Sequence, residues 1–321
     1  MKASFKAKAN IALIKYWGKT NRELNLPAVG SISITLDSLW SDTEVVFDES
    51  LERDFLYING EDFSNPIDRI KSCLDLIRKE AKVDFFAKII SKNNFPTASG
   101  LASSASGLAA IVLAASKALN LELSPRKLSI IARHGSGSAA RSIYSGFVEM
   151  FVGKNSDGSD SFAKQIAPAS HWPLEVVIAV TDTKKKEIGS RAAMELSALT
   201  SPFYNEWIKS SVSDLAIARD AIMNKDFESL SSITQSNCIK MHSVIMTSNP
   251  PVLYWNQATL ACIKMIMDLQ KSGVPVFFTV DAGPQVKAIC KPESTVMISD
   301  LLKKIPGVKK MIISTIDNSL V

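Results

Sequence analysis

The segment at residues 94–106, Asn-Phe-Pro-Thr-Ala-Ser-Gly-Leu-Ala-Ser-Ser-Ala-Ser, constrains this chain most strongly. Pro96 disfavours a helix before it, and Gly100 lets the backbone approach a ligand closely. The apolar run from Leu108 to Leu119 predicts a buried helix. The N-terminus of such a helix offers unpaired N–H groups and the positive end of the helix dipole. The segment therefore predicts a phosphate-binding loop without a Walker lysine, although serines that only cap a core helix would give the same pattern.

Length and composition indicate a globular enzyme. A chain of 321 residues favours two domains, and 46% hydrophobic with 21% charged residues is ordinary for a soluble enzyme. The longest apolar run, around residues 108–115, is too short and too rich in alanine to span a bilayer. The first residues lack the apolar core of a signal peptide. We therefore expect a cytoplasmic protein with no membrane partner.

The reactive side chains exclude several classes of site. The cysteines are far apart and form no CxxC pair, which predicts buried free thiols. With three histidines, a His-centred metal site or a Ser–His triad is not expected, and no protein metal ligand is predicted. The net charge of +5 suits anionic metabolites, but the charges are dispersed and form no basic stripe for nucleic acid. The lysine triplet at 184–186 predicts a solvated turn.

Hydrophobic periodicity predicts an α+β fold, because helices and strands interleave without a regular βαβ rhythm. A stretch rich in Gly, Ser, Asp and Pro before residue 173 places the domain boundary, giving domains 1–172 and 173–321. An Asn-Gly turn is expected at 59–60. Strands are predicted at 5–16, 32–36, 43–47, 55–58, 85–91, 174–180, 276–280 and 311–314, and helices at 66–81, 108–119, 124–133, 206–224, 226–241, 254–272 and 296–304.

The Gly-Ser-Gly-Ser-Ala-Ala segment at 135–140 matches the spacing of a dinucleotide-binding loop. That fingerprint follows a strand, whereas a helix is predicted directly before this segment. We therefore reject a nicotinamide-dependent oxidoreductase and predict an anion-binding loop, with a plain connector as the alternative.

Three other positions complete a candidate site. Lys15 and Lys19 flank two aromatic residues at the end of a predicted strand and could form the wall of an anion pocket. Arg141 follows the Gly/Ser loop, and a guanidinium binds carboxylate or phosphate through two parallel hydrogen bonds. Asp281 ends a predicted strand. A carboxylate held between cations stays ionised and can accept a proton from a hydroxyl, although a turn-forming aspartate is equally consistent with the sequence.

Taken together, these segments resemble the GHMP kinase superfamily and, within it, the mevalonate diphosphate decarboxylases. The resemblance implies an N-terminal domain like ribosomal protein S5 domain 2, a C-terminal ferredoxin-like domain, an active site in the cleft between them, and a homodimer. Six matches occur in the family's order, at residues 9–19, 95–106, 135–142, 182–194, 241–255 and 279–284.

The resemblance implies an ATP-dependent decarboxylation with ATP and Mg²⁺ as cofactors. ATP phosphorylates the 3-hydroxyl of (R)-5-diphosphomevalonate. The new phosphate then leaves as C1 departs as carbon dioxide, which gives isopentenyl diphosphate. The small-molecule substrate is the only partner expected besides a second copy of the chain.

The family's functional residues map onto this sequence as follows. Asp281 would orient or deprotonate the 3-hydroxyl, and Arg141 would hold the C1 carboxylate or a nearby phosphate oxygen. Lys15 would complete the catalytic group. Substrate binding would fall to Tyr16, Trp17, Lys19, Ser136, Gly137, Ser138, Arg141, Ser190 and Arg191. Nucleotide binding would fall to Asn94, Pro96, Ser99, Gly100, Leu101, Ala102, Ser103, Ser104 and Lys185.

The sequence departs from the family pattern at four positions. Val29 and Gly30 stand where the family usually has Asn and Ser, and they are expected to alter the polarity of the substrate pocket. Ala140 replaces a common cysteine, and Gln285 replaces a usual asparagine. These departures leave open a mevalonate or phosphomevalonate 3-kinase or decarboxylase of the same superfamily.

Overall fold

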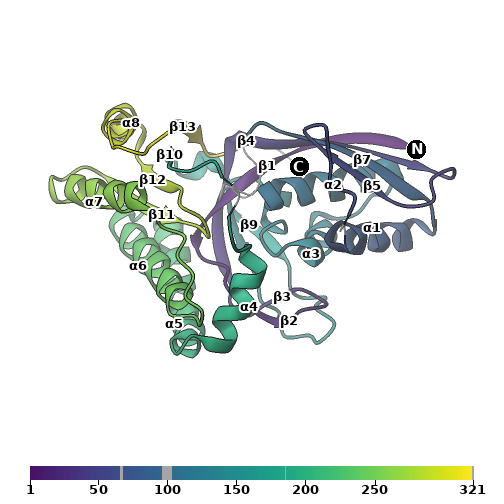
Figure 1. The fold of residues 1–321 in the computed structure, drawn as a ribbon, viewed down its shortest axis with the longest axis horizontal. Helices are drawn as coiled ribbons and strands as arrows, with labels where there is room; N and C mark the ends of the chain where they lie inside the picture. The colour runs from purple at the N-terminus through teal and green to yellow at the C-terminus, as the bar shows by residue number, and fades with distance from the viewer. Residues whose placement is uncertain (66–67, 96–102, 185, 320–321) are drawn as a thin grey trace.

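The computed structural model describes residues 1–65, 68–95, 103–184 and 186–319, and they form two α+β units (Figure 1). The first unit is built on a seven-stranded sheet in the order β6-β5-β7-β4-β8-β9, with β1 paired along β4. Its strands are β1 (Lys2–Ile14), β4 (Ser31–Asp48), β5 (Phe55–Ile58), β6 (Glu61–Asp62), β7 (Phe86–Asn93), β8 (Phe147–Met150) and β9 (Ala163–Ala167).

Three helices cover one face of this sheet: α1 (Asp68–Ala81), α2 (Ser103–Ala118) and α3 (Pro125–Gly135) (Figure 1). Helix α2 packs against β1 and β4 and contacts both α1 and α3, which also contact each other, so most of its side chains are buried. The start of α3 agrees with the sequence, because Ser124 Oγ accepts a hydrogen bond from the Lys127 N–H and proline occupies the first helical position. Helix α2 confirms the buried helix that the apolar run at 108–119 predicts.

The second unit is a four-stranded antiparallel sheet in the order β11-β12-β10-β13, with helices packed on it. Its strands are β10 (Glu175–Val180), β11 (Val276–Val280), β12 (Val286–Cys290) and β13 (Lys310–Thr315). Its helices are α4 (Ser190–Thr200), α5 (Tyr204–Asn224), α6 (Phe227–Met246), α7 (Gln257–Lys271) and α8 (Thr295–Lys303). A small hairpin of β2 (Lys19–Asn21) and β3 (Leu26–Pro27) lies near α4 (Figure 1).

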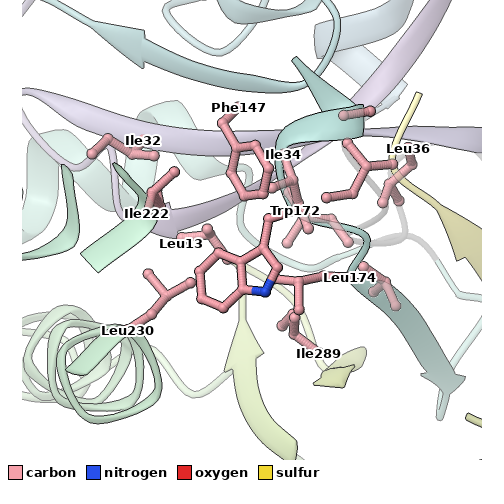
Figure 2. Packing of buried hydrophobic residues seen from close by; sticks show 14 of the residues in the cluster. Leu13, Ile32, Ile34, Leu36, Phe147, Trp172, Leu174, Ile222, Leu230 and Ile289 are labelled. Atoms are coloured by element: carbon pink, nitrogen blue, oxygen red, sulfur yellow. The ribbon is translucent and has the colours of Figure 1, made fainter. Parts of the chain in front are cut away.

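The two units share one hydrophobic core (Figure 2). Leu13 and Ile34 from the first sheet pack with Trp172, with Ile222 from α5 and with Ile289 from β12. This shared core holds the end of β1, which Lys15 follows, in a fixed position relative to the end of β11, which Asp281 follows. The domain boundary at 172/173 stays a prediction. Within the described residues, no helix combines the length and the apolar character that crossing a bilayer requires.

The structure corrects the predicted elements in several places. The strands expected at 32–36 and 43–47 are two halves of β4, which runs without a break. Two buried positions in the middle of β4 are polar: the Ser41 hydroxyl bonds Ser106 Oγ, and the Thr43 hydroxyl bonds Ser91 Oγ. The alternation of apolar residues is therefore interrupted there, although the strand continues. The elements β2, β3, β6, β8, β9, β12 and α4 were not predicted. The four cysteines are free and buried, as expected.

Candidate active site

A pocket of about 350 Å³ lies where the two units meet. The described residues that line it include six cationic side chains and one carboxylate, so the pocket suits a ligand with several negative charges. The sequence predictions that the structure places on its lining are Lys15, Tyr16, Trp17, Lys19, Ser103, Ser104, Ser136, Gly137, Ser138, Arg141, Ser190, Arg191 and Asp281.

Asp281 is the one carboxylate on that lining, and it follows the last residue of β11. Its Oδ1 accepts a hydrogen bond from Lys15 Nζ at 2.7 Å, and its Oδ2 lies 3.1 Å from Lys287 Nζ. The side chain is 23% exposed, whereas both lysines are 1% exposed. Burial alone would raise the pKa of Asp281, but the two ammonium groups outweigh it and hold the pKa well below its usual range. The carboxylate is therefore anionic and faces the pocket.

Arg141 lies in the short 3₁₀ turn Arg141–Ile143 and is 2% exposed. Its guanidinium donates to Ser33 Oγ at 2.9 Å, to Ser31 Oγ at 2.6 Å and to Asn10 Oδ1 at 3.2 Å. Burial lowers the pKa of Arg141 to about 10, with Asp281 opposing the shift, so the group stays cationic at neutral pH. All three partners are neutral, so its positive charge is available to an anionic ligand.

The loop between α3 and the turn at Arg141 passes directly under Tyr16. A Cβ on Gly137 would lie 2.5 Å from Tyr16 Cζ, so only glycine allows this approach. The hydroxyl groups of Ser136 and Ser138 lie 3.0 Å apart. The buried Tyr16 hydroxyl has no hydrogen-bond partner among the described residues, and burial raises the pKa of this phenol to about 12. The loop therefore presents neutral donors to the pocket beside an unsatisfied hydroxyl.

A second group of cations stands near this loop. Arg69 on α1 donates to the Gly135 carbonyl at 2.8 Å, and Arg191 is in the first turn of α4. Burial, together with the positive charges of Arg191 and Arg69, lowers the pKa of Lys19 to about 8. Mutual repulsion of this kind is relieved when an anion binds between the cations.

Lys186 also points into the pocket, which corrects the prediction of a solvated turn at this residue. Its ammonium donates to Ser190 Oγ at 2.9 Å and to the Ala282 carbonyl at 2.8 Å. Burial lowers the pKa of Lys186 to about 8, with Lys287 adding to the shift and Asp281 opposing it. The neighbouring Lys185, which the sequence assigned to the nucleotide, lies outside the described residues.

The predicted nucleotide loop is described at its two ends. The first residues of α2, Ser103 and Ser104, line the pocket. Asn94 does not line it, because its side chain bonds the backbone of β4, accepting from Trp40 N–H at 2.9 Å and donating to the Ser38 carbonyl at 2.7 Å. The remaining predicted nucleotide residues lie outside the described part of the chain: Pro96, Ser99, Gly100, Leu101 and Ala102.

Trp17 has a supporting place in the wall. Its side chain is 1% exposed, packs in a hydrophobic cluster, and donates through Nε1 to Ser197 Oγ at 2.8 Å. The contacts of Trp17 with the pocket are therefore limited, and its indole fixes α4 against the segment that carries Lys15 and Lys19.

The departures from the family pattern lie away from the pocket lining of the described chain. Val29 is buried in the cluster around Trp17, and a Cβ on Gly30 would meet Leu215 at 2.7 Å. The expectation that these two residues alter pocket polarity was therefore wrong. Ala140 is fully buried, and Gln285 accepts from the Thr181 N–H at 2.7 Å and donates to the Asp182 carbonyl, joining two loops.

Sequence reasoning missed Asn10, Arg69, Lys186 and Lys287. A signal for Lys287 existed, because a lysine inside the apolar run Val-Lys-Ala-Ile-Cys needs a buried partner. Arg69 gave no signal, since an arginine in the first turn of an amphipathic helix is usually solvated.

Comparison with known proteins identifies the family. The model described as Diphosphomevalonate decarboxylase-like N-terminal domain matches residues 7–163, and the model for the Mevalonate 5-diphosphate decarboxylase C-terminal domain matches residues 176–319. The diphosphomevalonate decarboxylase of Debaryomyces hansenii is 36% identical, over 99% of this chain and 87% of that protein.

Solved structures agree with these matches. The mevalonate diphosphate decarboxylase from Staphylococcus aureus superposes with a TM-score of 0.91 at 38% identity, over 99% of this chain and 97% of that chain. A structure described as MDDEF in complex with MVAPP, AMPPCP and magnesium also has a TM-score of 0.91, at 36% identity and the same coverage. The predicted two-domain GHMP kinase fold is confirmed, and the chain belongs to the diphosphomevalonate decarboxylase family.

Proposed function

We propose that this chain catalyses the ATP-dependent decarboxylation of (R)-5-diphosphomevalonate to isopentenyl diphosphate, with ADP, phosphate and carbon dioxide as the other products. The observation that carries the proposal is the ionised Asp281, held by Lys15 and Lys287 at the edge of a pocket whose other charged lining residues are cations. Family membership supports the same reaction, and the relatives named diphosphomevalonate decarboxylase span nearly the whole chain.

In the first step, Asp281 accepts a hydrogen bond from the 3-hydroxyl of the substrate and directs its oxygen at the γ-phosphorus of ATP. Because two lysines lower the pKa of this carboxylate, Asp281 orients the hydroxyl strongly but takes up its proton late, as the new O–P bond forms. A loose phosphoryl-transfer transition state needs little nucleophile activation, so orientation suffices. The Lys15 ammonium lies beside the same carboxylate and stabilises negative charge on the transferring group.

In the second step, the tertiary C3–O bond breaks and inorganic phosphate leaves with the electron pair. The positive charge that builds at C3 is neutralised as the C1–C2 bond breaks, since that electron pair forms the new double bond and C1 departs as carbon dioxide. Arg141 would hold the C1 carboxylate through the guanidinium, whose charge has only neutral partners in the described chain. The site must hold the carboxylate so that both bonds break in concert.

The diphosphate of the substrate would bind at the other end of the pocket. Lys19, Arg69 and Arg191 provide the charge, and Ser136 and Ser138 provide neutral donors. The unsatisfied Tyr16 hydroxyl supports this placement, because a phosphate oxygen would supply the missing acceptor.

ATP would bind with its phosphates toward Ser103 and Ser104, because a helix N-terminus favours phosphate. Lys186 supplies a half-buried cation for the transferring phosphoryl group in addition to the predicted Lys185. The serine hydroxyls and the nucleotide's own phosphates suit Mg²⁺, an ion that prefers oxygen ligands and neutralises phosphate charge. The related structure described with MVAPP, AMPPCP and magnesium supports ATP and Mg²⁺ as the cofactors.

A homodimer and a cytoplasmic location complete the proposal, and both rest on the sequence prediction. Light scattering on the purified chain tests the first, because a homodimer has twice the mass of the 35.0 kDa chain.

The test of the proposed reaction is turnover of ATP with mevalonate, 5-phosphomevalonate and 5-diphosphomevalonate, with carbon dioxide and ADP measured together. We expect equal amounts of carbon dioxide and ADP from the diphosphorylated form. Formation of ADP without gas would identify a 3-kinase. Preference for a less phosphorylated mevalonate would identify the alternative decarboxylase.

A further inference from the structure

The backbone of Lys15 needs a hydrogen-bond acceptor that the sheet does not supply. Pairing of β1 with β4 ends at Ile14 opposite Ile32, so Lys15 is the first residue beyond the ladder. It is nevertheless 1% exposed, and a buried N–H without a partner would be costly. The acceptor is Asn237 Oδ1 on α6, at 2.8 Å from Lys15 N. A side chain from the second unit therefore replaces the missing strand partner.

The orientation of the Asn237 amide is fixed by chemistry. Its Nδ2 donates to Asp214 Oδ2 on α5 at 2.7 Å, and a carboxylate can only accept. The amide oxygen must therefore face Lys15. Asn237 is fully buried and Asp214 is 4% exposed, and Lys240 forms an ion pair with the same carboxylate. The chain from Lys240 through Asp214 to Asn237 leaves the amide one orientation.

The same helix also contacts the residue before Asp281. Cys238 Sγ accepts from the Val280 N–H at 3.2 Å, and His242 Nε2 lies 3.1 Å from the Val280 carbonyl. Helix α6, which packs beside β11 in Figure 1, thus bonds the backbone of Lys15 itself and that of the residue before Asp281. Lys15 Nζ and Asp281 Oδ1, which lie 2.7 Å apart, are thus carried by two backbone segments that the same helix bonds.

We propose that Asn237 is a positioning residue that sets the Lys15–Asp281 ion pair by holding the backbone N–H of Lys15. Asn237 does not line the pocket of the described chain, so it acts through Lys15 and makes no substrate contact of its own. The proposal rests on the proposed function, because it assigns Asn237 a part in the same reaction. A positioning role predicts that loss of Asn237 lowers kcat at nearly constant KM, since a displaced reacting group slows the chemical step more than it weakens binding.

The first variant is Asn237→Leu, which has a similar volume but no acceptor for Lys15 N–H. We expect kcat to fall about 10- to 100-fold, the loss typical of a group displaced by about 1 Å, with KM for ATP and for diphosphomevalonate little changed. The matched control is Thr234→Val, one turn earlier on α6. Thr234 is fully buried, and its hydroxyl has no partner among the described residues, so the control should keep kcat and KM.

The rescue is the exchange Asp214→Asn with Asn237→Asp. In this pair the carboxylate at 237 accepts from the Lys15 N–H, and the amide at 214 donates to it, so both hydrogen bonds persist. We expect kcat to return close to that of the unaltered chain. If Asn237→Leu does not fold, the activity of this exchanged pair tests the positioning role of residue 237 instead.

Three results would overturn the proposal. The first is an Asn237→Leu enzyme with unaltered kcat. The second is an exchanged pair that folds but has a kcat as low as that of Asn237→Leu. The third is loss of folding in both variants, which would assign Asn237 to the stability of the fold. Failure of the unaltered chain to release carbon dioxide is a separate outcome that refutes the proposed function.

Discussion

Lys15 Nζ lies 2.7 Å from Asp281 Oδ1, although 266 positions separate the two residues. Lys15 follows the last residue of β1 in the first sheet, and Asp281 follows the last residue of β11 in the second. The ion pair therefore exists only where the two units pack together. Leu13 in β1 and Phe277 in β11 belong to the same hydrophobic core. A substitution in that core would therefore displace the reacting groups as well as lower the stability of the fold.

Replacing Asp281 should make the protein less stable as well as inactive. Asp281→Asn removes the negative charge that pairs with the buried Lys15 and Lys287, and we expect a loss of about 3–5 kcal/mol in the free energy of unfolding at neutral pH. Urea denaturation measures it. In the double variant Lys15→Met with Asp281→Asn, the loss should be smaller than the sum of the single losses. Additive losses would mean that the two side chains are not coupled.

The same substitution predicts a pH dependence of stability. The folded pKa of Asp281 lies below its usual 3.8, so its contribution is present above that pH and is lost as the pH falls through the folded value. The difference in unfolding free energy between the unaltered chain and Asp281→Asn should therefore be constant at neutral pH and shrink below pH 3.8. A difference that stays constant into acid would show that the folded pKa is not lowered.

Binding of the acidic substrate should weaken above pH 8. The pKa values of Lys19 and Lys186 are both lowered to about 8, and each lysine must be protonated to attract an anion. We expect kcat/KM to be highest below pH 8 and to fall as the pH rises through it, because this ratio reports the free enzyme. Lys186→Arg, which keeps its charge, should reduce the part of the fall that Lys186 causes. An unchanged profile in that variant would remove Lys186 from the explanation.

Two lysines of the 184–186 triplet should behave differently. Lys186→Ala removes a half-buried cation that bonds Ser190 Oγ and the Ala282 carbonyl. We expect kcat/KM for ATP to fall about tenfold or more, the effect of losing a charged hydrogen bond. Lys184 is exposed and does not line the pocket, so Lys184→Ala is the matched control and should change nothing. Equal effects of the two substitutions would support the original prediction of a solvated turn.

Two glycine substitutions should also differ. Gly137→Ala places a Cβ 2.5 Å from Tyr16 Cζ, so the tyrosine must move and KM for the substrate should rise. Gly107 is inside α2, where a Cβ would come no closer than 3.9 Å to Ser41 Oγ. Gly107→Ala should keep activity and stabilise the fold by about 0.5–1 kcal/mol, because alanine loses less backbone entropy than glycine. Steady-state kinetics and thermal unfolding measure both variants. An unchanged KM in Gly137→Ala would mean that Tyr16 does not contact substrate.

Much of the fold follows from local signals. The Ser124-Pro125 pair correctly predicts the start of α3, and the apolar run that begins at residue 108 correctly predicts a helix in the place of α2. The strand β12 was missed because Lys287 interrupts its apolar run, and Asp281 forms an ion pair with that buried lysine. Its partner is outside the strand, so periodicity alone could not find it.

The site was predictable where a motif carried it. Lys15, Arg141 and Asp281 stand in recognisable segments, and the structure places all three on one pocket. Arg69 and Asn237 lie on ordinary amphipathic helices, and their importance depends on which helix packs against which loop. That information is in the tertiary arrangement and in no local pattern.

The most direct test of the account compares the unaltered chain with Asp281→Asn in single turnovers of ATP and diphosphomevalonate, with carbon dioxide and ADP as readouts. We expect the unaltered chain to release one carbon dioxide for each ADP. The variant should bind ATP with similar affinity and be slower by about 10²- to 10⁴-fold, the usual contribution of a positioned acid or base. An Asp281→Asn enzyme that decarboxylates at the unaltered rate would contradict the central role of this carboxylate.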